Sequence, residues 1–142
     1  MLPPMPATSV PPSPRARVLA VDDSFVMREL VSASLEAAGY SVETVASGDA
    51  ALVAAARERF DAFILDVDMP GMDGMAVGRA LRRDPRTRAS MIAMHTSLDE
   101  AAVRTGFDGY DAFLPKPCDA RLLGECVGRM IQTRRSRARA AS

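Results

Sequence analysis

Short apolar runs alternate along the chain with longer stretches in which apolar residues recur at helical spacing. A run of four or five apolar residues is typical of a strand buried on both faces, whereas apolar residues three or four positions apart indicate one face of a helix. The pattern predicts five strands, at residues 17–21, 42–45, 62–65, 91–95 and 112–114. It predicts five helices that follow them, at residues 24–38, 48–59, 74–82, 98–104 and 120–134. Strands that alternate with helices in this way require a parallel sheet covered on both faces, so we expect a doubly wound α/β fold.

Two local signals refine this pattern. Ser24 is a favoured capping residue, and the helix after it carries apolar residues at helical spacing along one face, namely Val26, Leu30, Ala33 and Ala37. Pro115, beside the fifth strand, cannot donate to a sheet ladder, so that strand should lie at an edge. The flavodoxin-like strand order 2-1-3-4-5 places the fifth strand at an edge, and we expect that order.

Composition divides the chain into three parts. Six of the ten prolines and no charged residue lie in residues 1–14, which we expect to be a disordered Pro-rich tail. Residues 15–131 form one domain, and 48% apolar residues in a chain of 142 suffice for a packed core. That domain has a net charge of −4, which argues against nucleic-acid binding by the domain itself. Residues 132–142 form a basic C-terminal tail with four arginines, which we interpret as the solvated end of the last helix.

The cysteine and histidine content excludes several kinds of site. Cys118 and Cys126 are eight residues apart without a C-x-x-C motif, so zinc and a disulfide framework are both disfavoured, and we expect reduced thiols with Cys126 on the buried face of a helix. The single histidine, His95, should point to the opposite face of its strand from Thr96, and we interpret it as a structural residue with satisfied hydrogen bonds. No apolar run reaches membrane-spanning length and no signal peptide is evident, so we expect a cytoplasmic protein without membrane contact.

Charged and polar groups follow four of the five predicted strands. Asp22 and Asp23 come after the first, Asp66 after the third, Thr96 after the fourth and Lys116 after the fifth. An isolated Asp at such a place usually caps a turn, but parallel strands bring all these ends to one edge of the sheet. Three carboxylates repel one another unless a cation joins them, and oxygen ligands with room for phosphate suit Mg²⁺. The pattern therefore predicts that Asp66 is a nucleophile that accepts a phosphoryl group, with Lys116 and Thr96 binding phosphoryl oxygens.

Over residues 15–131 the chain resembles the receiver domain of two-component response regulators. The residues that carry the resemblance are Val21-Asp22-Asp23-Ser24, Asp66 with Met69-Pro70-Gly71-Met72-Asp73-Gly74, Thr96, Phe113 and Lys116-Pro117. Each motif alone is weak, but their combination is specific.

The resemblance implies a complete mechanism. Asp66 would take phosphate from a phosphohistidine of a sensor histidine kinase, with slow dephosphorylation and without multiple-turnover enzyme activity. Asp23 and Asp66 would bind Mg²⁺ directly, Asp22 mostly through water, and Asp68 through its backbone carbonyl. Thr96 and Phe113 would form the switch pair, and Lys116-Pro117 would be a cis peptide. The fourth helix, fifth strand and fifth helix would form the face that contacts a downstream protein.

The sequence leaves open how the domain passes on its signal, and it allows other functions. Because only residues 132–142 follow the domain, we expect a monomeric or weakly dimeric single-domain regulator that acts by protein contact, resembling chemotaxis regulators. A phosphorelay intermediate or phosphate sink is the alternative. Asp66-Val67-Asp68 also resembles the opening motif of haloacid-dehalogenase-like phosphohydrolases, although there the acidic metal pair comes late in the chain. A third alternative is a phosphate-independent binding module, against which the complete set of site residues argues.

Overall fold

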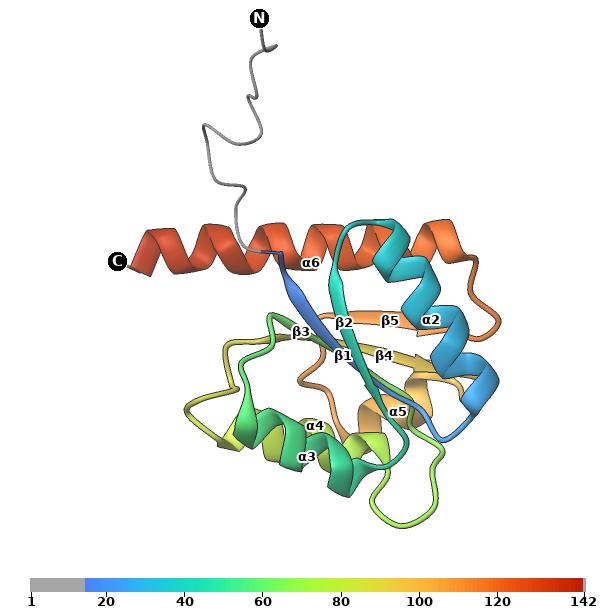
Figure 1. Cartoon of the computed structure of the whole chain (residues 1–142). Helices are drawn as coiled ribbons and strands as arrows, with labels where there is room; N and C mark the ends of the chain where they lie inside the picture. The colour runs from blue at the N-terminus through green and yellow to red at the C-terminus, as the bar shows by residue number, and fades with distance from the viewer. Residues whose placement is uncertain (1–14, 142) are drawn as a thin grey trace, which may run out of the picture.

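The computed structural model describes residues 15–141, and within that range it contains five strands and five helices (Figure 1). The strands are β1 (Arg17–Val21), β2 (Ser41–Val45), β3 (Ala62–Leu65), β4 (Met91–Thr96) and β5 (Ala112–Pro115). The helices are α2 (Phe25–Ala37), α3 (Gly48–Arg57), α4 (Gly74–Arg83), α5 (Glu100–Gly106) and α6 (Ala120–Ala141). All strand pairs are parallel and the order is β2-β1-β3-β4-β5, so the predicted doubly wound, flavodoxin-like α/β fold is confirmed. The predicted Pro-rich tail, residues 1–14, lies outside the described residues.

The helices form two layers on opposite faces of the sheet. Figure 1 shows α2 and α6 on one side and α3, α4 and α5 on the other. Because side chains alternate along a strand, each strand contributes to both cores. Leu19, Phe63 and Ile92 belong to the core under α3, α4 and α5, whereas Val18 and Ile64 belong to the core under α2 and α6. No helix within residues 15–141 is long and apolar enough to cross a membrane.

The buried face of α2 differs from the apolar face predicted from the sequence, because Val26, Leu30, Ala33 and Ala37 are all exposed. Val26 is 65% exposed and Leu30 is 56% exposed, whereas Val31 and Leu35 are buried against the sheet. Both sets follow helical spacing, so spacing alone could not decide which of them faces the core. The start of α2 is as expected, since the Ser24 hydroxyl accepts a hydrogen bond from the Met27 backbone N–H at 3.2 Å.

The last strand is at the predicted position, and the last helix is longer than predicted. β5 lies at an edge of the sheet, as Pro115 required. The last helix, α6, runs to Ala141 instead of ending near Arg134. Its later part is fixed to the body by Arg134, which donates hydrogen bonds to Asp61 Oδ1 at 3.3 Å and to the Ala89 carbonyl at 3.0 Å. Cys126 is buried on the inner face of this helix, as predicted.

Candidate functional site

Three carboxylates meet at the carboxyl ends of β1 and β3. Asp22 and Asp23 follow β1, and Asp66 follows β3, which pairs with β1 in parallel register. One oxygen of each carboxylate lies within 4.8 Å of the other two. The Lys116 ammonium, directly after β5, lies 2.6 Å from Asp22 Oδ2 and 3.4 Å from Asp66 Oδ2. The structure thus brings together four residues that follow three different strands in the sequence.

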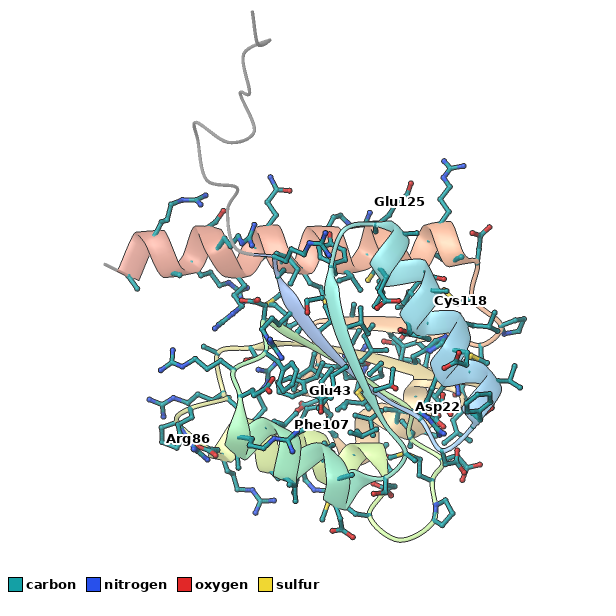
Figure 2. All side chains as sticks on the ribbon, in the orientation of Figure 1. Asp22, Glu43, Arg86, Phe107, Cys118 and Glu125 are labelled. Carbon is teal, nitrogen blue, oxygen red and sulfur yellow. The ribbon has the colours of Figure 1, made fainter. Side chains whose placement is uncertain are left out.

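Asp22 is fixed by hydrogen bonds at the point where the chain turns from β1 into α2 (Figure 2). It is 4% exposed, and its Oδ1 accepts a hydrogen bond from the Ser24 backbone N–H at 2.9 Å. Its backbone carbonyl accepts a hydrogen bond from the Arg28 guanidinium at 2.8 Å. Arg28 could not be predicted as part of the site from the sequence, where its only signal is a basic residue four positions after the Ser24 cap. Asp23, by contrast, is exposed to solvent.

The electrostatics of Asp66 favour a nearby cation. Its carboxylate is 5% exposed, and burial raises its pKa above the ordinary value. The Lys116 ammonium opposes this shift and lowers the pKa, while the Asp22 carboxylate raises it further. Burial and like charge together outweigh the ammonium, so the ionised form of Asp66 needs more positive charge than Lys116 supplies.

The turn after Asp66 depends on two glycines. Gly71 has a φ of 72°, in the left-handed region that L side chains rarely adopt. Gly74 begins α4, and a Cβ at this position would collide with the Asp66 carbonyl. Asp73 caps the helix by accepting a hydrogen bond from the Ala76 backbone N–H at 2.9 Å. Gly74 therefore allows the start of α4 to pack directly against the backbone of the acidic residue.

Lys116 is positioned by the edge of the sheet. Its backbone N–H donates a hydrogen bond to the Thr96 carbonyl at 2.9 Å, which continues the pairing of β4 with β5. The Lys116-Pro117 peptide bond is cis, as the resemblance implied. The Lys116 ammonium reaches across the end of the sheet and donates a hydrogen bond to Asp22 Oδ2.

The proposed switch residues lie on β4 and β5. Thr96 is fully buried, and its hydroxyl oxygen accepts a hydrogen bond from the Leu98 backbone N–H at 3.2 Å. Phe113 is half-buried, with its ring centroid 6.1 Å from that of Tyr110. The Tyr110 hydroxyl donates a hydrogen bond to Glu100 Oε2 at 2.6 Å, which connects this aromatic pair to α5. The Phe113 side chain is thus linked to the short helix that the resemblance includes in the signalling face.

Asp68 and His95, the other two residues discussed from the sequence, have contrasting surroundings. The Asp68 side chain is exposed, in keeping with a residue that would contribute only its backbone carbonyl. His95 is buried on the side of β4 that faces α2 and α6, opposite to the side of Thr96, as predicted. The expectation that its hydrogen bonds are satisfied was wrong, because its Nε2 is buried without a partner among the described residues.

The donor set fits a hard divalent cation. Three carboxylates and one ammonium leave two excess negative charges, and all the donors are oxygen atoms. Oxygen ligands of Mg²⁺ lie about 2 Å from the ion, so they are roughly 3–4 Å from one another, a spacing that carboxylates within 4.8 Å reach by small movements. Burial of Asp22 and Asp66 also makes their charges costly without such an ion.

Comparison with known proteins identifies the class of protein that this fold and site define. The sequence profile of the response regulator receiver domain matches residues 18–127. The response regulator PleD of Caulobacter vibrioides is 44% identical over 110 residues, which cover 76% of this chain and 24% of PleD. The response regulator MprA of Mycobacterium leprae is 44% identical over 103 residues, which cover 71% of this chain and 44% of MprA. The chain therefore spans less than half the length of these two curated relatives.

Solved structures agree with this assignment. The chemotaxis protein CheY4 of Vibrio cholerae has a TM-score of 0.78 at 37% identity, with 82% of this chain and 98% of that chain covered. A sensor protein from Polaromonas sp. JS666 has a TM-score of 0.78 at 31% identity, with 85% of this chain and 99% of that chain covered. The chain belongs to the receiver domain family of two-component response regulators. Receiver domains bind Mg²⁺ at an acidic Asp cluster, and the Asp22, Asp23 and Asp66 cluster stands where such a site is expected.

Proposed function

We propose that Asp66 accepts a phosphoryl group from a phosphohistidine of a partner histidine kinase, and that the chain then signals to another protein. The observation that carries this proposal is the cluster of three carboxylates with the Lys116 ammonium 3.4 Å from Asp66 Oδ2. A purely structural role would require neither three adjacent acids nor a lysine reaching across the sheet to them. Membership of the receiver family supports the same chemistry.

The residues divide the chemistry among them. A carboxylate oxygen of Asp66 attacks the phosphorus atom, the P–N bond of the phosphohistidine breaks, and the electron pair leaves with the imidazole. Asp22, Asp23, Asp66 and the backbone carbonyl of Asp68 would hold Mg²⁺, which spreads the negative charge of the transferring group. Lys116, whose ammonium already contacts the Asp66 carboxylate, binds one oxygen of the phosphoryl group.

Signalling would start at the two switch residues. The Thr96 hydroxyl turns towards a phosphoryl oxygen and gives up its hydrogen bond from the Leu98 backbone. The space behind it then accepts the half-buried ring of Phe113. The surface formed by α5, β5 and α6 changes with this ring, and we propose that the downstream protein binds there.

The start of α2 offers the kinase a surface beside the acidic cluster. Phe25 and Val26 are each 65% exposed and Leu30 is 56% exposed, an unusual exposure for three large apolar side chains on one helix. The first of them, Phe25, comes two residues after Asp23 in the chain. We infer that the helix of the kinase that carries the phosphohistidine packs against these residues, since it must approach Asp66 from this edge.

Phosphotransfer from the host's own histidine kinases tests the proposal. Each kinase is loaded with labelled phosphate and mixed with the full chain, with and without Mg²⁺. We expect rapid, Mg²⁺-dependent labelling by one kinase and no labelling of Asp66→Asn. Asp68→Asn is the matched control, because it removes an exposed carboxylate but keeps the backbone carbonyl, and it should still be labelled. Labelling of Asp66→Asn at the wild-type rate would show that the site is assigned wrongly.

The same assay separates the alternatives. Movement of the label from this chain to a second histidine-containing protein would indicate a relay role. Rapid loss of label from the kinase through this chain, followed by hydrolysis, would indicate a phosphate sink. Steady turnover of p-nitrophenyl phosphate would instead favour a phosphohydrolase. Receiver family membership over residues 18–127 supports the response regulator.

A further inference from the structure

His95 breaks the rule that buried polar groups find hydrogen-bond partners. It is 4% exposed, and its Nε2 has no partner within residues 15–141. One other buried side-chain atom, Nε of Arg17, is also unpaired in this range. That arginine has compensating contacts, because its guanidinium pairs with Glu58 and lies over the Phe60 ring. Within the described part of the chain, the imidazole of His95 makes no ion pair, hydrogen bond or ring contact, so its burial requires another explanation.

The imidazole lines a pocket on the face of the sheet that α2 and α6 cover. The pocket has a volume of about 210 Å³ and is bounded by α2, by β4 and by the segment that leads from β5 into α6. Figure 2 labels Cys118 in that segment, beside α2. The lining residues are Met27, Leu30, Val31, Ser34, His95, Pro117, Cys118, Ala120 and Leu123.

Three of these residues carry nitrogen or sulfur atoms that bind metals, and the two sulfur atoms are soft ligands. They are the imidazole of His95, which is the only histidine of the chain, the thiol of Cys118 and the thioether of Met27. Cys118 and Met27 both pack, partly buried, against the apolar core that contains the strand of His95. Thiol, thioether and imidazole donors in apolar surroundings favour a soft ion such as copper(I), whereas zinc sites rarely use a thioether.

The protonation states suit such an ion. Burial, with a smaller contribution from the Lys116 charge, lowers the pKa of His95 to about 4, so its ring is neutral and a nitrogen lone pair is free at neutral pH. Burial also raises the pKa of the Cys118 thiol, so its proton is still present in the metal-free chain. The contact of this thiol with the Asp119 carbonyl is weak, at 3.5 Å, and does not fix it.

We propose that this pocket binds one copper(I) ion through His95, Cys118 and Met27. Binding forms a Cu–N bond, a Cu–thiolate bond and a Cu–thioether bond, the Cys118 proton is released to solvent, and no electron is transferred. The flexible Met27 side chain and the Cys118 side chain close on the ion by rotation. The site is separate from the Asp66 cluster, whose hard carboxylate oxygens favour Mg²⁺.

Copper(I) titration of the full chain tests the proposal. The chain is kept anaerobic and reduced, and a chromophoric copper(I) chelator of known affinity competes for the ion. We expect binding of one equivalent. Because His95 is the only histidine, its ring signals in the proton NMR spectrum report directly on coordination and should shift with that equivalent. The melting temperature should also rise, since the ion connects α2 to the segment after β5.

Four variants locate the site. Cys118→Ser, His95→Leu and Met27→Leu should each weaken copper(I) binding, by at least about tenfold. Cys126→Ser is the matched control, because it removes the other thiol of the chain, which lies outside this pocket, and it should bind like the wild type. Melting curves show that each variant is folded, and Cys118→Ser and Met27→Leu still test the site if His95→Leu folds poorly.

Three outcomes would overturn the proposal. They are unchanged affinity in both Cys118→Ser and His95→Leu, loss of binding in Cys126→Ser alone, and tighter binding of zinc(II) than of copper(I). Each outcome concerns the metal pocket only, because phosphotransfer to Asp66 is measured separately.

Discussion

Asp66 shows how function and stability oppose each other at a single residue. Its pKa lies above the ordinary value of 3.8 because of burial and the nearby Asp22 charge, against which Lys116 acts only in part. The folded chain therefore binds the Asp66 proton more firmly than the unfolded chain does. Stability from this group is present at low pH and is lost as the pH rises through the folded pKa.

Asp66→Asn should accordingly be more stable than the wild type at neutral pH without Mg²⁺. The amide keeps the shape of the side chain but removes a buried charge, so we expect a gain of about 1 kcal/mol in the free energy of unfolding. Urea unfolding at pH 7 and near pH 3 measures this difference, which should shrink at the lower pH. A variant that is less stable than the wild type at both pH values would contradict this view of the site.

His95 gives a second residue-scale prediction with a different pH dependence. Its folded pKa of about 4 lies below the ordinary 6.5, so between these values the unfolded chain binds more protons than the folded chain. Wild-type stability therefore falls as the pH is lowered from 6.5 towards 4, by up to about 3 kcal/mol relative to His95→Leu. At neutral pH we expect His95→Leu to be about 1 kcal/mol more stable, because an unpaired buried polar group is removed. If the difference in the free energy of unfolding between the two proteins stays constant across this pH range, the prediction is refuted.

Among the elements, glycines on two helices show how closely each helix packs. A Cβ at Gly78 in α4 would lie 2.5 Å from the Phe107 ring, whereas a Cβ at Gly124 in α6 would lie at an ordinary 3.8 Å from Ala38 Cβ. Phe107 is buried in the core and cannot move freely. The close approach of α4 to the segment after α5 therefore requires a glycine, and the position on α6 does not.

The same change to alanine at these two glycines should have opposite effects. We expect Gly78→Ala to lower the free energy of unfolding by about 2 kcal/mol through overpacking. Gly124→Ala should raise it by roughly 0.5–1 kcal/mol, because alanine is the better helix former. Thermal or urea unfolding of both variants measures the contrast. Equal effects would show that α4 does not pack on Phe107 as the structure describes.

Most elements could be predicted from the sequence because local signals agreed with one another. Apolar runs indicated β1, β3, β4 and β5, whereas β2 has only two apolar residues, and the Ser24 cap marked the start of α2. The buried face of α2 could not be predicted, because the set with Val26 and the set with Val31 both follow helical spacing and only packing on the sheet decides between them. The end of α6 was placed too early because the apolar spacing stops at Ile131, although no glycine or proline after Gly128 ends the helix.

Prediction of the site from sequence had a similar limit. Residue types at strand ends were enough to select Asp22, Asp66 and Lys116, because the topology of a parallel sheet brings such ends together. Contacts that depend on side-chain direction were missed, such as the hydrogen bond from Arg28 to the Asp22 carbonyl. The unpaired state of His95 was missed for the same reason, since its surroundings come from distant segments.

Across the molecule as a whole, two proposed functions are located in different places, namely kinase recognition on α2 and phosphoryl transfer at the acidic cluster. We expect that each can be impaired without the other. The proposed kinase surface contains Leu30, while the phosphoryl chemistry resides in the cluster around Asp66. Phosphorylation by a small acyl phosphate needs only the cluster, whereas transfer from the kinase needs both. Comparison of the two donors therefore tests partner recognition apart from chemistry.

Leu30→Lys should slow transfer from the cognate kinase about tenfold, roughly 1.4 kcal/mol, and leave labelling by a small acyl phosphate unchanged. Val53→Lys is the matched control, because Val53 is 61% exposed but lies on α3, and it should behave like the wild type with both donors. Initial rates of labelling measure the effect. Equal slowing by both variants would exclude the α2 surface as the specific contact.

The central claim, that Asp66 itself carries the phosphoryl group, is tested most directly by locating that group in the chain. The phosphorylated protein is treated with borohydride, which reduces an aspartyl phosphate to homoserine, and the peptides are sequenced by mass spectrometry. We expect homoserine at position 66, formed only when Mg²⁺ and the phosphodonor were both present. Homoserine at Asp22, Asp23 or Asp68, or phosphate that remains on a residue other than an aspartate, would contradict it.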